Sequence, residues 1–468
     1  MERLKKIGTV PPRNSADIKE SRLGVGMEKL DRDAFDPDKA YDKIAALGVK
    51  WIRLQSGWQK TEMEEGVYDF SWLDRQVDEL RARGLIPWLC LCYGNRIYDD
   101  LAGEYLGAVG CAPIRTERAY TAWLNYVEAT VRHFAGRIQY YEIWNEPEGS
   151  CTWRPEGNPA EYAEFCVKTG RTIKASDGNA KVIVGSHYQE SMVFFNGEFS
   201  NGVLEVADAV SYHSYHYDET NSMRRAGAFK ALGRCYGKDL EVIQGETGSQ
   251  SKSGGNGAFS WVRTNPQMQA KYILRHAVGE ILAGVKFTSV FSCVDMAENL
   301  SARSGAPIST CGYFGLLEGD FDPATGLLSG DYREKPSYYA FRNLCSLFNE
   351  NVVPEEMPVI FRPQESRRIN GRDDPTKALV FGGVSKANGG KAFAFWNSTD
   401  LTTCQAYEST VTFELAGVEG EIFLVDPMDG AVYEIGNGVG QNRGNGLYLF
   451  ENFPVKDYPM ILVWGNFT

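Results

Sequence analysis

The chain has 468 residues, of which 43% are hydrophobic and 24% are charged, and its formal net charge is -12 at pH 7. This composition is typical of a globular protein with a large core and excludes a disordered chain. Because nucleic-acid binding relies on clustered Lys and Arg, the negative charge argues against a nucleic-acid partner.

The N-terminal segment carries Arg3, Lys5 and Lys6 but lacks the apolar core that a secretory signal needs. From the chain as it stands we therefore expect a cytoplasmic protein, or a secreted one if a native signal was removed. No stretch of the sequence is apolar for long enough to span a bilayer, so no membrane partner is predicted.

The first three quarters of the chain alternate short β-branched or aromatic runs with amphipathic helical stretches, from about Arg22 to about Phe348. This alternation is typical of repeated βα units around a parallel sheet. The number of units predicts an α/β fold, a closed (β/α)8 TIM barrel over residues 21–350 that comes after an N-terminal extension at 1–20. The predicted strands are 23–26, 50–54, 86–92, 139–144, 181–185, 209–213, 240–244 and 286–291.

Local signals support several of the intervening helices. Asp36-Pro37 and Lys335-Pro336 each predict a helix start, with a cap residue and then a proline in the first turn. Further helices are predicted at 71–83, 116–134, 159–175 and 266–283.

After about Glu350 the pattern changes to strands separated by Gly, Asn and Asp, at 378–384, 392–396, 410–415, 421–426 and 460–464. This spacing predicts an all-β accessory domain, a sandwich, at 351–468. Because no Pro- or Ser-rich linker precedes it, we interpret this domain as packed support for the barrel. A polysaccharide-binding module is the alternative.

Two polar segments, 249–264 and 299–332, come after the seventh and eighth predicted strands. In a barrel these positions are βα loops on the face where active sites are built. We expect both segments to shape a substrate pocket, with ordinary mobile connections as the alternative.

Two glutamates come directly after apolar strands. The strand at 139–144 runs into Asn145, Glu146 and Pro147, and the strand at 240–244 runs into Gly245 and Glu246. A barrel places both carboxyl groups at the catalytic mouth. Hydrolysis of a glycosidic bond needs one carboxylic acid to protonate the leaving oxygen and one carboxylate to attack the anomeric carbon. Taken singly, each glutamate is better explained by a helix cap or an ion pair, and only the two contexts together favour catalysis.

The motif Glu-Ile-Trp-Asn-Glu-Pro at 142–147 carries a family resemblance. The barrel region resembles clan A glycoside hydrolases, and most of all the family 39 group of β-xylosidases and α-L-iduronidases. The resemblance implies Glu146 as the general acid/base and Asn145 as a hydrogen-bond donor to the sugar 2-hydroxyl. It also implies Glu246 as the nucleophile after the seventh strand.

Two further stretches are similar to the family: Trp-Ile-Arg-Leu at 51–54 with Tyr-Asp-Phe-Ser-Trp-Leu-Asp at 68–74, and His-Ser-Tyr at 213–215. Physically, Arg53 could donate to Glu246 and hold it ionised. His213 and Tyr215 could position the nucleophile or bind a sugar hydroxyl. A satisfied structural histidine is the alternative interpretation of His213.

The sequence also departs from the family pattern. Gln55 stands where relatives often carry His, and the eighth strand lacks the Trp that many clan A enzymes use as a sugar platform. Other aromatics near the predicted mouth could supply stacking faces or could simply be packed: Trp58, Tyr93, Tyr98, Trp153, Tyr188 and Trp261.

The sequence therefore predicts a retaining glycoside hydrolase that uses a two-glutamate double displacement. We expect exo action on short β-linked oligosaccharides or glycosides, with a carbohydrate as substrate and neither cofactor nor metal. An endo-acting clan A glycanase and a catalytically silent carbohydrate-binding barrel are the alternatives. A metal-dependent barrel enzyme is disfavoured, because the chain has only 5 His and no HExxH-like spacing.

The retaining mechanism makes two geometric and electrostatic demands. The carboxyl groups of Glu146 and Glu246 should be about 5 to 5.5 Å apart. The pKa of Glu146 should also be higher than that of Glu246, because the acid must hold its proton near neutral pH.

Overall fold

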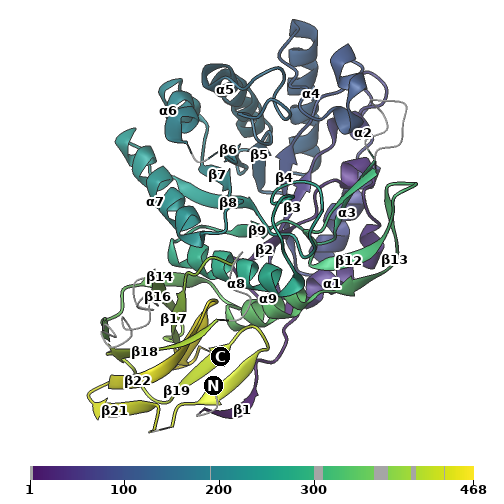
Figure 1. The fold of residues 1–468 in the computed structure, drawn as a ribbon. Coiled ribbons are helices and arrows are strands. Elements are labelled where there is room, and N and C mark those ends of the chain that lie inside the picture. The colour runs from purple at the N-terminus through teal and green to yellow at the C-terminus, as the bar shows by residue number, and fades with distance from the viewer. Residues whose placement is uncertain are drawn as a thin grey trace.

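The computed structural model describes residues 4–189, 191–299, 309–362, 378–401, 407–436 and 438–467. Its N-terminal part is a closed barrel of eight parallel strands surrounded by helices (Figure 1). Each strand overlaps one of the eight predicted strands, so the predicted barrel is confirmed. In barrel order they are β2 (Gly24–Gly26), β3 (Trp51–Gln55), β4 (Ile86–Leu91), β5 (Tyr140–Ile143), β6 (Lys181–His187), β7 (Ala209–His213), β8 (Glu241–Thr247) and β9 (Thr288–Val290).

The amino end of the barrel is filled by aromatic side chains. Trp51 stacks on Phe287 with 4.0 Å between ring centroids, and Tyr140 and Trp88 meet the same phenylalanine edge-on. These residues lie at or near the beginnings of their strands. Because these aromatic rings fill the amino end of the barrel, we expect a ligand-binding site at its carboxyl end.

The helices that surround the barrel mostly begin where capping residues predict. Thr116 accepts from the backbone N–H of Ala119, and Asn158 and Asn265 cap helices whose first residue is proline. The helices are α1 (Tyr41–Ala46), α2 (Trp58–Thr61), α3 (Ser71–Ala82), α4 (Glu117–His133), α5 (Pro159–Ser176), α6 (Met192–Ser200), α7 (Glu219–Cys235), α8 (Pro266–Leu282) and α9 (Pro336–Leu347).

Two predicted helix starts differ in detail from the structure. Asp36 does act as a cap, but it caps a short 3-10 helix, Pro37–Lys39, that precedes α1. Lys335 occupies the N-cap position of α9 but makes no side-chain cap bond, because an ammonium group cannot accept a hydrogen bond. Its Nζ donates to Asp295 Oδ1 at 2.6 Å and to Ser251 Oγ at 2.8 Å. Helices α2, α6 and α7 were not predicted.

The described part of the segment after the eighth barrel strand contains strands, whereas residues 300–308 of the predicted loop 299–332 lie outside the described residues. Two antiparallel hairpins lie there, β10 (Met296–Asn299) with β11 (Ser309–Gly312) and β12 (Leu317–Asp322) with β13 (Leu327–Glu334). The second hairpin contacts the segment before α1, where the Tyr332 hydroxyl oxygen accepts from the Asp36 N–H at 2.8 Å. This hairpin therefore covers the side of the barrel.

The C-terminal part is a β-sandwich, as predicted (Figure 1). Phe393 and Phe395 of one sheet pack against Phe413 of the other, with centroids 6.2 and 5.4 Å apart. One sheet has the order β1-β20-β19-β23-β17-β16-β14 and the other β15-β18-β22-β21. The strands are β1 (Lys5–Thr9), β14 (Val352–Glu355), β15 (Val359–Arg362), β16 (Leu379–Lys386), β17 (Lys391–Asn397), β18 (Glu408–Leu415), β19 (Ile422–Asp426), β20 (Ala431–Glu434), β21 (Gly440–Gly444), β22 (Leu447–Lys456) and β23 (Met460–Trp464).

The N-terminal extension takes part in this sandwich. Strand β1 pairs antiparallel with β20, with Lys5 opposite Glu434, so the larger sheet is built from both ends of the chain. Figure 1 shows the two termini close together in this domain.

Buried polar contacts join the sandwich to the barrel. Glu219 of α7 accepts from Trp396 Nε1 at 2.6 Å and forms an ion pair with Arg275 of α8. Arg275 in turn donates to Ser398 Oγ and Thr399 O, both at 2.9 Å. These contacts show that the sandwich packs directly on the barrel.

We expect Glu219→Ala to destabilise the protein by about 3 to 5 kcal/mol, because Arg275 would stay buried without its carboxylate. Urea unfolding monitored by fluorescence and by far-UV circular dichroism measures the loss. Arg171→Ala, which breaks the exposed bidentate pair with Glu205, is the matched control and should change little. Equal effects of the two variants would contradict the role of Glu219 in joining the domains.

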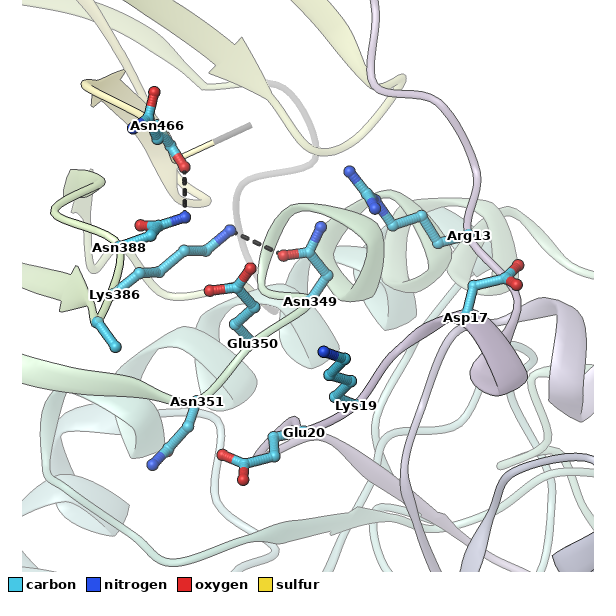
Figure 2. A pocket seen from close by; sticks show the side chains of 11 residues that line it. Arg13, Asp17, Lys19, Glu20, Asn349, Glu350, Asn351, Lys386, Asn388 and Asn466 are labelled. Carbon is cyan, nitrogen blue, oxygen red and sulfur yellow. Dashed lines mark hydrogen bonds between the residues drawn. The ribbon is translucent and has the colours of Figure 1, made fainter.

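A polar cleft of 460 Å³ lies where the N-terminal segment, the end of α9 and the sandwich meet (Figure 2). Lys386 donates to Asn349 Oδ1 at 2.8 Å, and Asn388 donates to Asn466 O at 3.0 Å. Charges of both signs line the cleft, so it has no preference for a ligand of one charge. Within the described residues, no helix is long and apolar enough to cross a membrane.

Candidate active site

The carboxyl ends of four barrel strands bring the predicted site residues together. Arg53 lies in β3, Asn145 and Glu146 come after β5, His213 ends β7, and Glu246 lies near the end of β8. His213 and Glu246 are direct partners in the register of β7 with β8. Tyr215, two residues beyond β7, completes the cluster, so all six predicted residues meet at one place.

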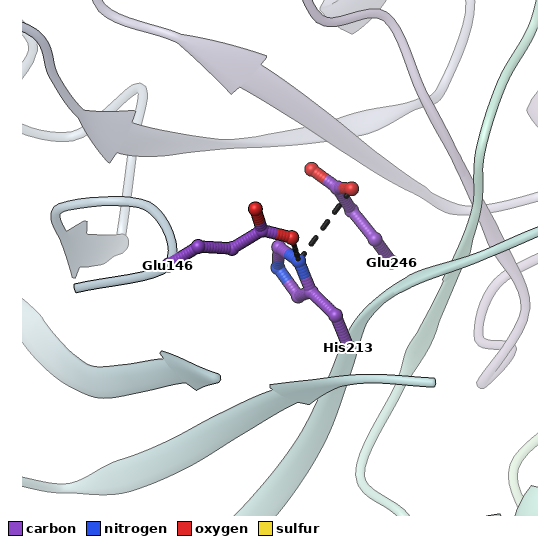
Figure 3. A group of neighbouring side chains, drawn as sticks. All are labelled: Glu146, His213 and Glu246. Carbon is purple, nitrogen blue, oxygen red and sulfur yellow. Dashed lines mark hydrogen bonds and ion pairs between the residues drawn. The ribbon is translucent and has the colours of Figure 1, made fainter. Parts of the chain in front are cut away.

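The two glutamates face each other across His213 (Figure 3). His213 Nδ1 lies 2.8 Å from Glu146 Oε1 and 3.5 Å from Glu246 Oε2. One carboxylate oxygen from each glutamate and a ring nitrogen of His213 all lie within 4.8 Å of one another. The Glu146 side chain is 19% exposed and that of Glu246 9%, so Glu146 is the more accessible of the two.

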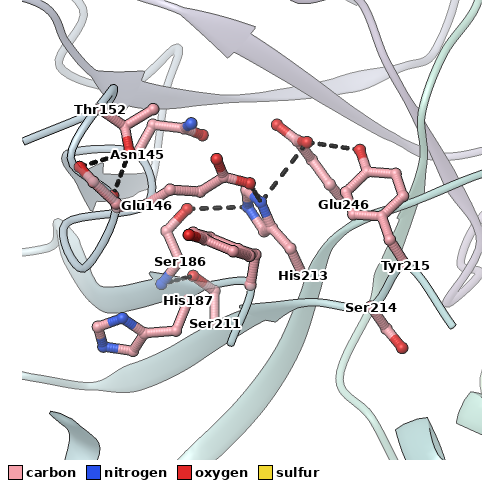
Figure 4. A network of polar contacts seen from close by, with 12 residues as sticks. Asn145, Glu146, Thr152, Ser186, His187, Ser211, His213, Ser214, Tyr215 and Glu246 are labelled. Atoms are coloured by element: carbon pink, nitrogen blue, oxygen red, sulfur yellow. Dashed lines mark hydrogen bonds and ion pairs between the residues drawn. The ribbon is translucent and has the colours of Figure 1, made fainter. Parts of the chain in front are cut away.

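A strained backbone aims Glu146 into the mouth. Both Trp144 and Glu146 have positive φ, at 68° and 53°, which non-glycine residues seldom adopt. Surrounding bonds hold this shape: Glu146 N–H donates to Ser186 O at 3.2 Å, and Thr152 Oγ1 donates to Glu146 O at 2.6 Å (Figure 4). The strain is typical of a position whose side chain direction is functional.

Arg53 is the buried cation at the centre of the site. Its guanidinium donates to Glu142 Oε2 at 2.9 and 2.6 Å, and it also forms an ion pair with Glu246 Oε1. Its Nη2 donates to Asn145 Oδ1 at 2.7 Å. Glu142 was part of the family motif, but its role as the counter-ion of Arg53 was not predicted.

The surroundings of Glu246 favour its ionised form. Burial alone would raise its pKa, but the charges of His213 and Arg53 and the hydrogen bonds from Tyr215 and Arg53 outweigh burial and lower it. The Tyr215 hydroxyl donates to Glu246 Oε2 at 2.7 Å. A carboxylate held ionised in this way suits a nucleophile.

The surroundings of Glu146 favour its protonated form. Burial raises its pKa, and the negative charge of Glu246 adds to this effect, although His213 opposes it. The two carboxyl groups therefore shift in opposite directions, in the order that the sequence predicts. The pKa of His213 is itself raised, because the two glutamates outweigh the effect of its burial.

The amide oxygen of Asn145 already accepts a hydrogen bond. Because Oδ1 accepts from Arg53, the amide is oriented with its Nδ2 group as the donor that remains. A donor fixed in this way suits the binding of a hydroxyl group.

The cluster opens into a cavity of 820 Å³. Of the candidate stacking aromatics, Tyr93, Tyr188 and Trp261 line this cavity, and Trp261 is 81% exposed. Trp58 and Trp153 are buried in the core instead, and Tyr98 stacks on Trp58. Sequence reasoning missed other lining residues, which belong to no distinctive motif: Glu28, Arg32, Tyr105, Arg154, Phe259, Phe291 and Phe314.

The two polar segments differ in what they contribute to this cavity. Gly257, Ala258, Phe259 and Trp261 of the first segment line it. In the second, Phe314 lines it, whereas the β12–β13 hairpin lies elsewhere. The expectation for the first segment agrees with the structure, and that for the second holds only in part.

Glu146, His213 and Glu246 have ligand atoms close enough together to hold a metal ion. Their existing partners account for this spacing without one. His213 Nδ1 faces Glu146 Oε1, and Arg53 and Tyr215 occupy the two oxygens of Glu246. The guanidinium of Arg53 against this carboxylate also disfavours a second cation by charge repulsion.

Solved structures share this architecture over nearly the whole chain. A family 39 glycoside hydrolase from Bacteroides cellulosilyticus matches with a TM-score of 0.66 and 17% identity, covering 95% of this chain and 81% of that one. A family 39 β-xylosidase from Caulobacter crescentus matches with a TM-score of 0.57 and 15% identity, covering 98% of both chains. The chain has the fold of the clan A glycoside hydrolases. The predicted resemblance to clan A and its family 39 group is thus confirmed at the level of the fold.

Sequence comparisons agree with this fold over shorter stretches. A family model described as beta-galactosidase, for glycoside hydrolase family 42, matches residues 28–94. The beta-galactosidase BbgII of Bifidobacterium bifidum is 27% identical over an alignment of 181 residues, and the match covers 33% of this chain and 25% of that protein. The chain thus aligns with about a quarter of the length of that curated relative.

The structure shows what lies at the two positions where the sequence departs from the clan A pattern. Gln55 lines the cavity, and its Oε1 accepts from Arg32 Nη2 at 2.7 Å. Phe291 comes directly after the eighth barrel strand and lines the cavity, where Phe314 packs against it with centroids 5.5 Å apart. An aromatic face is therefore present after this strand although the Trp is absent.

Proposed function

We propose that this chain is a retaining glycoside hydrolase with Glu246 as nucleophile and Glu146 as general acid/base. The observation that carries the proposal is the pair of facing carboxyl groups whose oxygens lie within 4.8 Å and whose pKa values shift in opposite directions. A separation this short favours direct attack by a carboxylate, because inverting enzymes need about 6.5 to 9.5 Å to hold a water molecule.

In the first step, an oxygen of Glu246 attacks the anomeric carbon while the bond to the leaving oxygen breaks. Glu146 gives its proton to that oxygen, and a covalent glycosyl-enzyme is formed. Arg53 and Tyr215 hold the attacking carboxylate in place. The donor on Asn145 is available to a hydroxyl of the bound sugar.

In the second step, Glu146, now ionised, takes a proton from water as the water oxygen attacks the anomeric carbon. The bond to Glu246 breaks and its carboxylate is restored. Two inversions at one carbon give net retention of configuration. His213 contacts both glutamates and can balance the charge as it moves between them.

We favour exo action on short β-linked substrates, with endo action and a catalytically silent sugar-binding barrel as the alternatives. The cavity is lined by residues of both long segments, namely Phe259, Trp261 and Phe314. Loops that enclose a cavity in this way favour the binding of a terminal sugar. The names of the relatives suggest which sugars to test first, namely β-xylosides and β-galactosides.

A panel of 4-nitrophenyl glycosides tests the activity, and proton NMR of the first product formed tests the stereochemistry. We expect the β-anomer from a β-glycoside. Release of the α-anomer would contradict the retaining mechanism. Product analysis on a tetrasaccharide separates exo from endo action, and full activity in EDTA is expected because no step requires a metal.

The pH dependence of kcat/KM should reflect both glutamates. The acid limb reports ionisation of Glu246 and the basic limb reports loss of the proton from Glu146. Tyr215→Phe removes a hydrogen bond that lowers the pKa of Glu246, so the acid limb should move to higher pH. Activity on the plateau should fall roughly 10- to 100-fold, as for a lost hydrogen bond to a charged group.

Tyr217→Phe is the matched control for this variant, because its hydroxyl contacts Ser249 at 3.1 Å and not Glu246. Its pH profile should match that of the wild type. An unmoved acid limb in Tyr215→Phe would show that Tyr215 does not control the ionisation of Glu246.

A further inference from the structure

Glu28 is a third carboxyl group in the catalytic cavity that the double displacement does not use. It lies two residues beyond the first barrel strand and lines the cavity, and its side chain is only 1% exposed. Its Oε1 lies 3.5 Å from Arg53 Nη1, whereas its Oε2 has no hydrogen-bond partner among the residues that the structure describes. A buried carboxyl oxygen without a partner costs about 1 to 3 kcal/mol or more, so its presence needs an explanation.

The backbone makes room for this carboxyl group. Gly26 lies in β2 directly below it, and a Cβ at that position would lie only 2.1 Å from Glu28 Oε2. The absence of a side chain at Gly26 lets the Glu28 carboxyl group fold back over the strand. It reaches the same guanidinium that holds the proposed nucleophile, Glu246.

Arg53 does not need Glu28 as a counter-ion. Glu142 already accepts two bonds from its guanidinium, at 2.9 and 2.6 Å, and Glu246 forms an ion pair with it. Burial and the nearby charge of Glu246 raise the pKa of Glu28 to about 8. A protonated carboxyl group can both donate and accept a hydrogen bond, which matches the chemistry of a sugar hydroxyl.

We infer that Glu28 binds a hydroxyl group of the sugar ring, on the edge away from the scissile bond, and thereby selects the sugar. The guanidinium of Arg53 lies between the two polar groups that would contact the ring. Its Nη2 contacts Asn145, and its Nη1 contacts Glu28. Two strands, β3 and β4, also separate the Glu28 strand from the Glu146 strand. A ring with its anomeric carbon at Glu246 and its leaving oxygen at Glu146 therefore points its C3 and C4 edge toward Glu28.

This inference rests on the proposed function for the placement of the sugar, and deoxy substrates test it. The probes are 4-nitrophenyl β-D-xyloside and β-D-galactoside, each with its 3-deoxy and 4-deoxy analogues. One of the two deoxy analogues lacks the hydroxyl group that Glu28 contacts. The kcat/KM of the wild type should be roughly 10- to 100-fold higher for the parent glycoside than for that analogue. Glu28→Ala should lose about this factor on the parent and nothing on that analogue, whereas Glu28→Gln should keep the preference.

Glu104→Ala is the matched control, because Glu104 is an exposed glutamate that also lines the cavity. It should keep the wild-type preference. If Glu28→Ala lowers activity equally on the parent and both analogues, Glu28 has only a structural role and the inference is wrong.

Calorimetric binding of the same glycosides to Glu246→Gln, with and without Glu28→Ala, separates this inference from the proposed function. One outcome is that the protein binds the parent glycoside more tightly than the analogue, that this preference depends on Glu28, and that the wild type cleaves neither. This outcome would contradict the hydrolase assignment but support the role of Glu28. Turnover with no dependence on Glu28 in either assay would overturn the role of Glu28 alone. Failure to bind or cleave any of these glycosides would count against both.

Discussion

Glu246→Ala should lower kcat by roughly 10⁴- to 10⁶-fold on every glycoside, the range expected when an essential nucleophile is deleted. Without this carboxylate no covalent intermediate can form. Arg53 keeps Glu142 as its counter-ion, so the barrel should still fold. Steady-state kinetics on a 4-nitrophenyl glycoside measure the loss, and circular dichroism checks the fold.

Sodium azide should restore part of this activity and give a product of inverted configuration. The small anion occupies the space of the missing side chain and attacks the anomeric carbon from that face, while Glu146 protonates the leaving oxygen. From a β-glycoside the product is an α-glycosyl azide, which NMR identifies. A β-glycosyl azide would assign the nucleophile to another residue.

Glu241→Ala is the matched control for this experiment. Glu241 is a glutamate of the same strand, β8, but it lies at the amino end and pairs with Lys286 at 2.8 Å. Its loss should leave kcat close to that of the wild type. A comparable loss in both variants would mean that damage to β8, and not the missing nucleophile, explains the effect.

Glu146→Ala should affect substrates according to their leaving groups. Glycosides with poor leaving groups should lose about 10²- to 10⁴-fold in kcat/KM, the usual contribution of general acid catalysis. Dinitrophenyl glycosides should lose far less, because their leaving oxygen needs little protonation. A series of aryl glycosides with graded leaving-group pKa measures this dependence, which should be steep in the variant and shallow in the wild type.

Two further features distinguish loss of the acid/base from a general loss of function. The basic limb of the pH profile should disappear, because that limb reports the raised pKa of Glu146. Azide should now attack the glycosyl-enzyme and give a product of retained configuration. Glu156→Ala, an exposed glutamate in the same loop, should behave as the wild type. Equal losses on all leaving groups would argue against Glu146 as the acid.

The sequence by itself determined the barrel and the candidate glutamates, because both depend on local patterns. Runs such as 139–144 and 209–213 are largely apolar, as expected for parallel strands buried on both faces, and the structure has β5 and β7 there with every residue buried. Because the carboxyl ends of such strands share one face of a barrel, polar residues directly after them are expected to meet. This rule places Asn145, Glu146 and Glu246 at one mouth.

Only the tertiary structure decided how those residues are joined. Glu142 and Asn145 surround Arg53 across a sequence separation of about 90 residues, and no local pattern specifies such a contact. The spacing of the two carboxyl groups and the opposite shifts of their pKa values depend on burial and on charges from β3, β7 and β8 together. Glu28 comes after a three-residue strand without a motif, so it is distinguished from an ordinary surface glutamate by its buried oxygen, which is unpaired among the described residues.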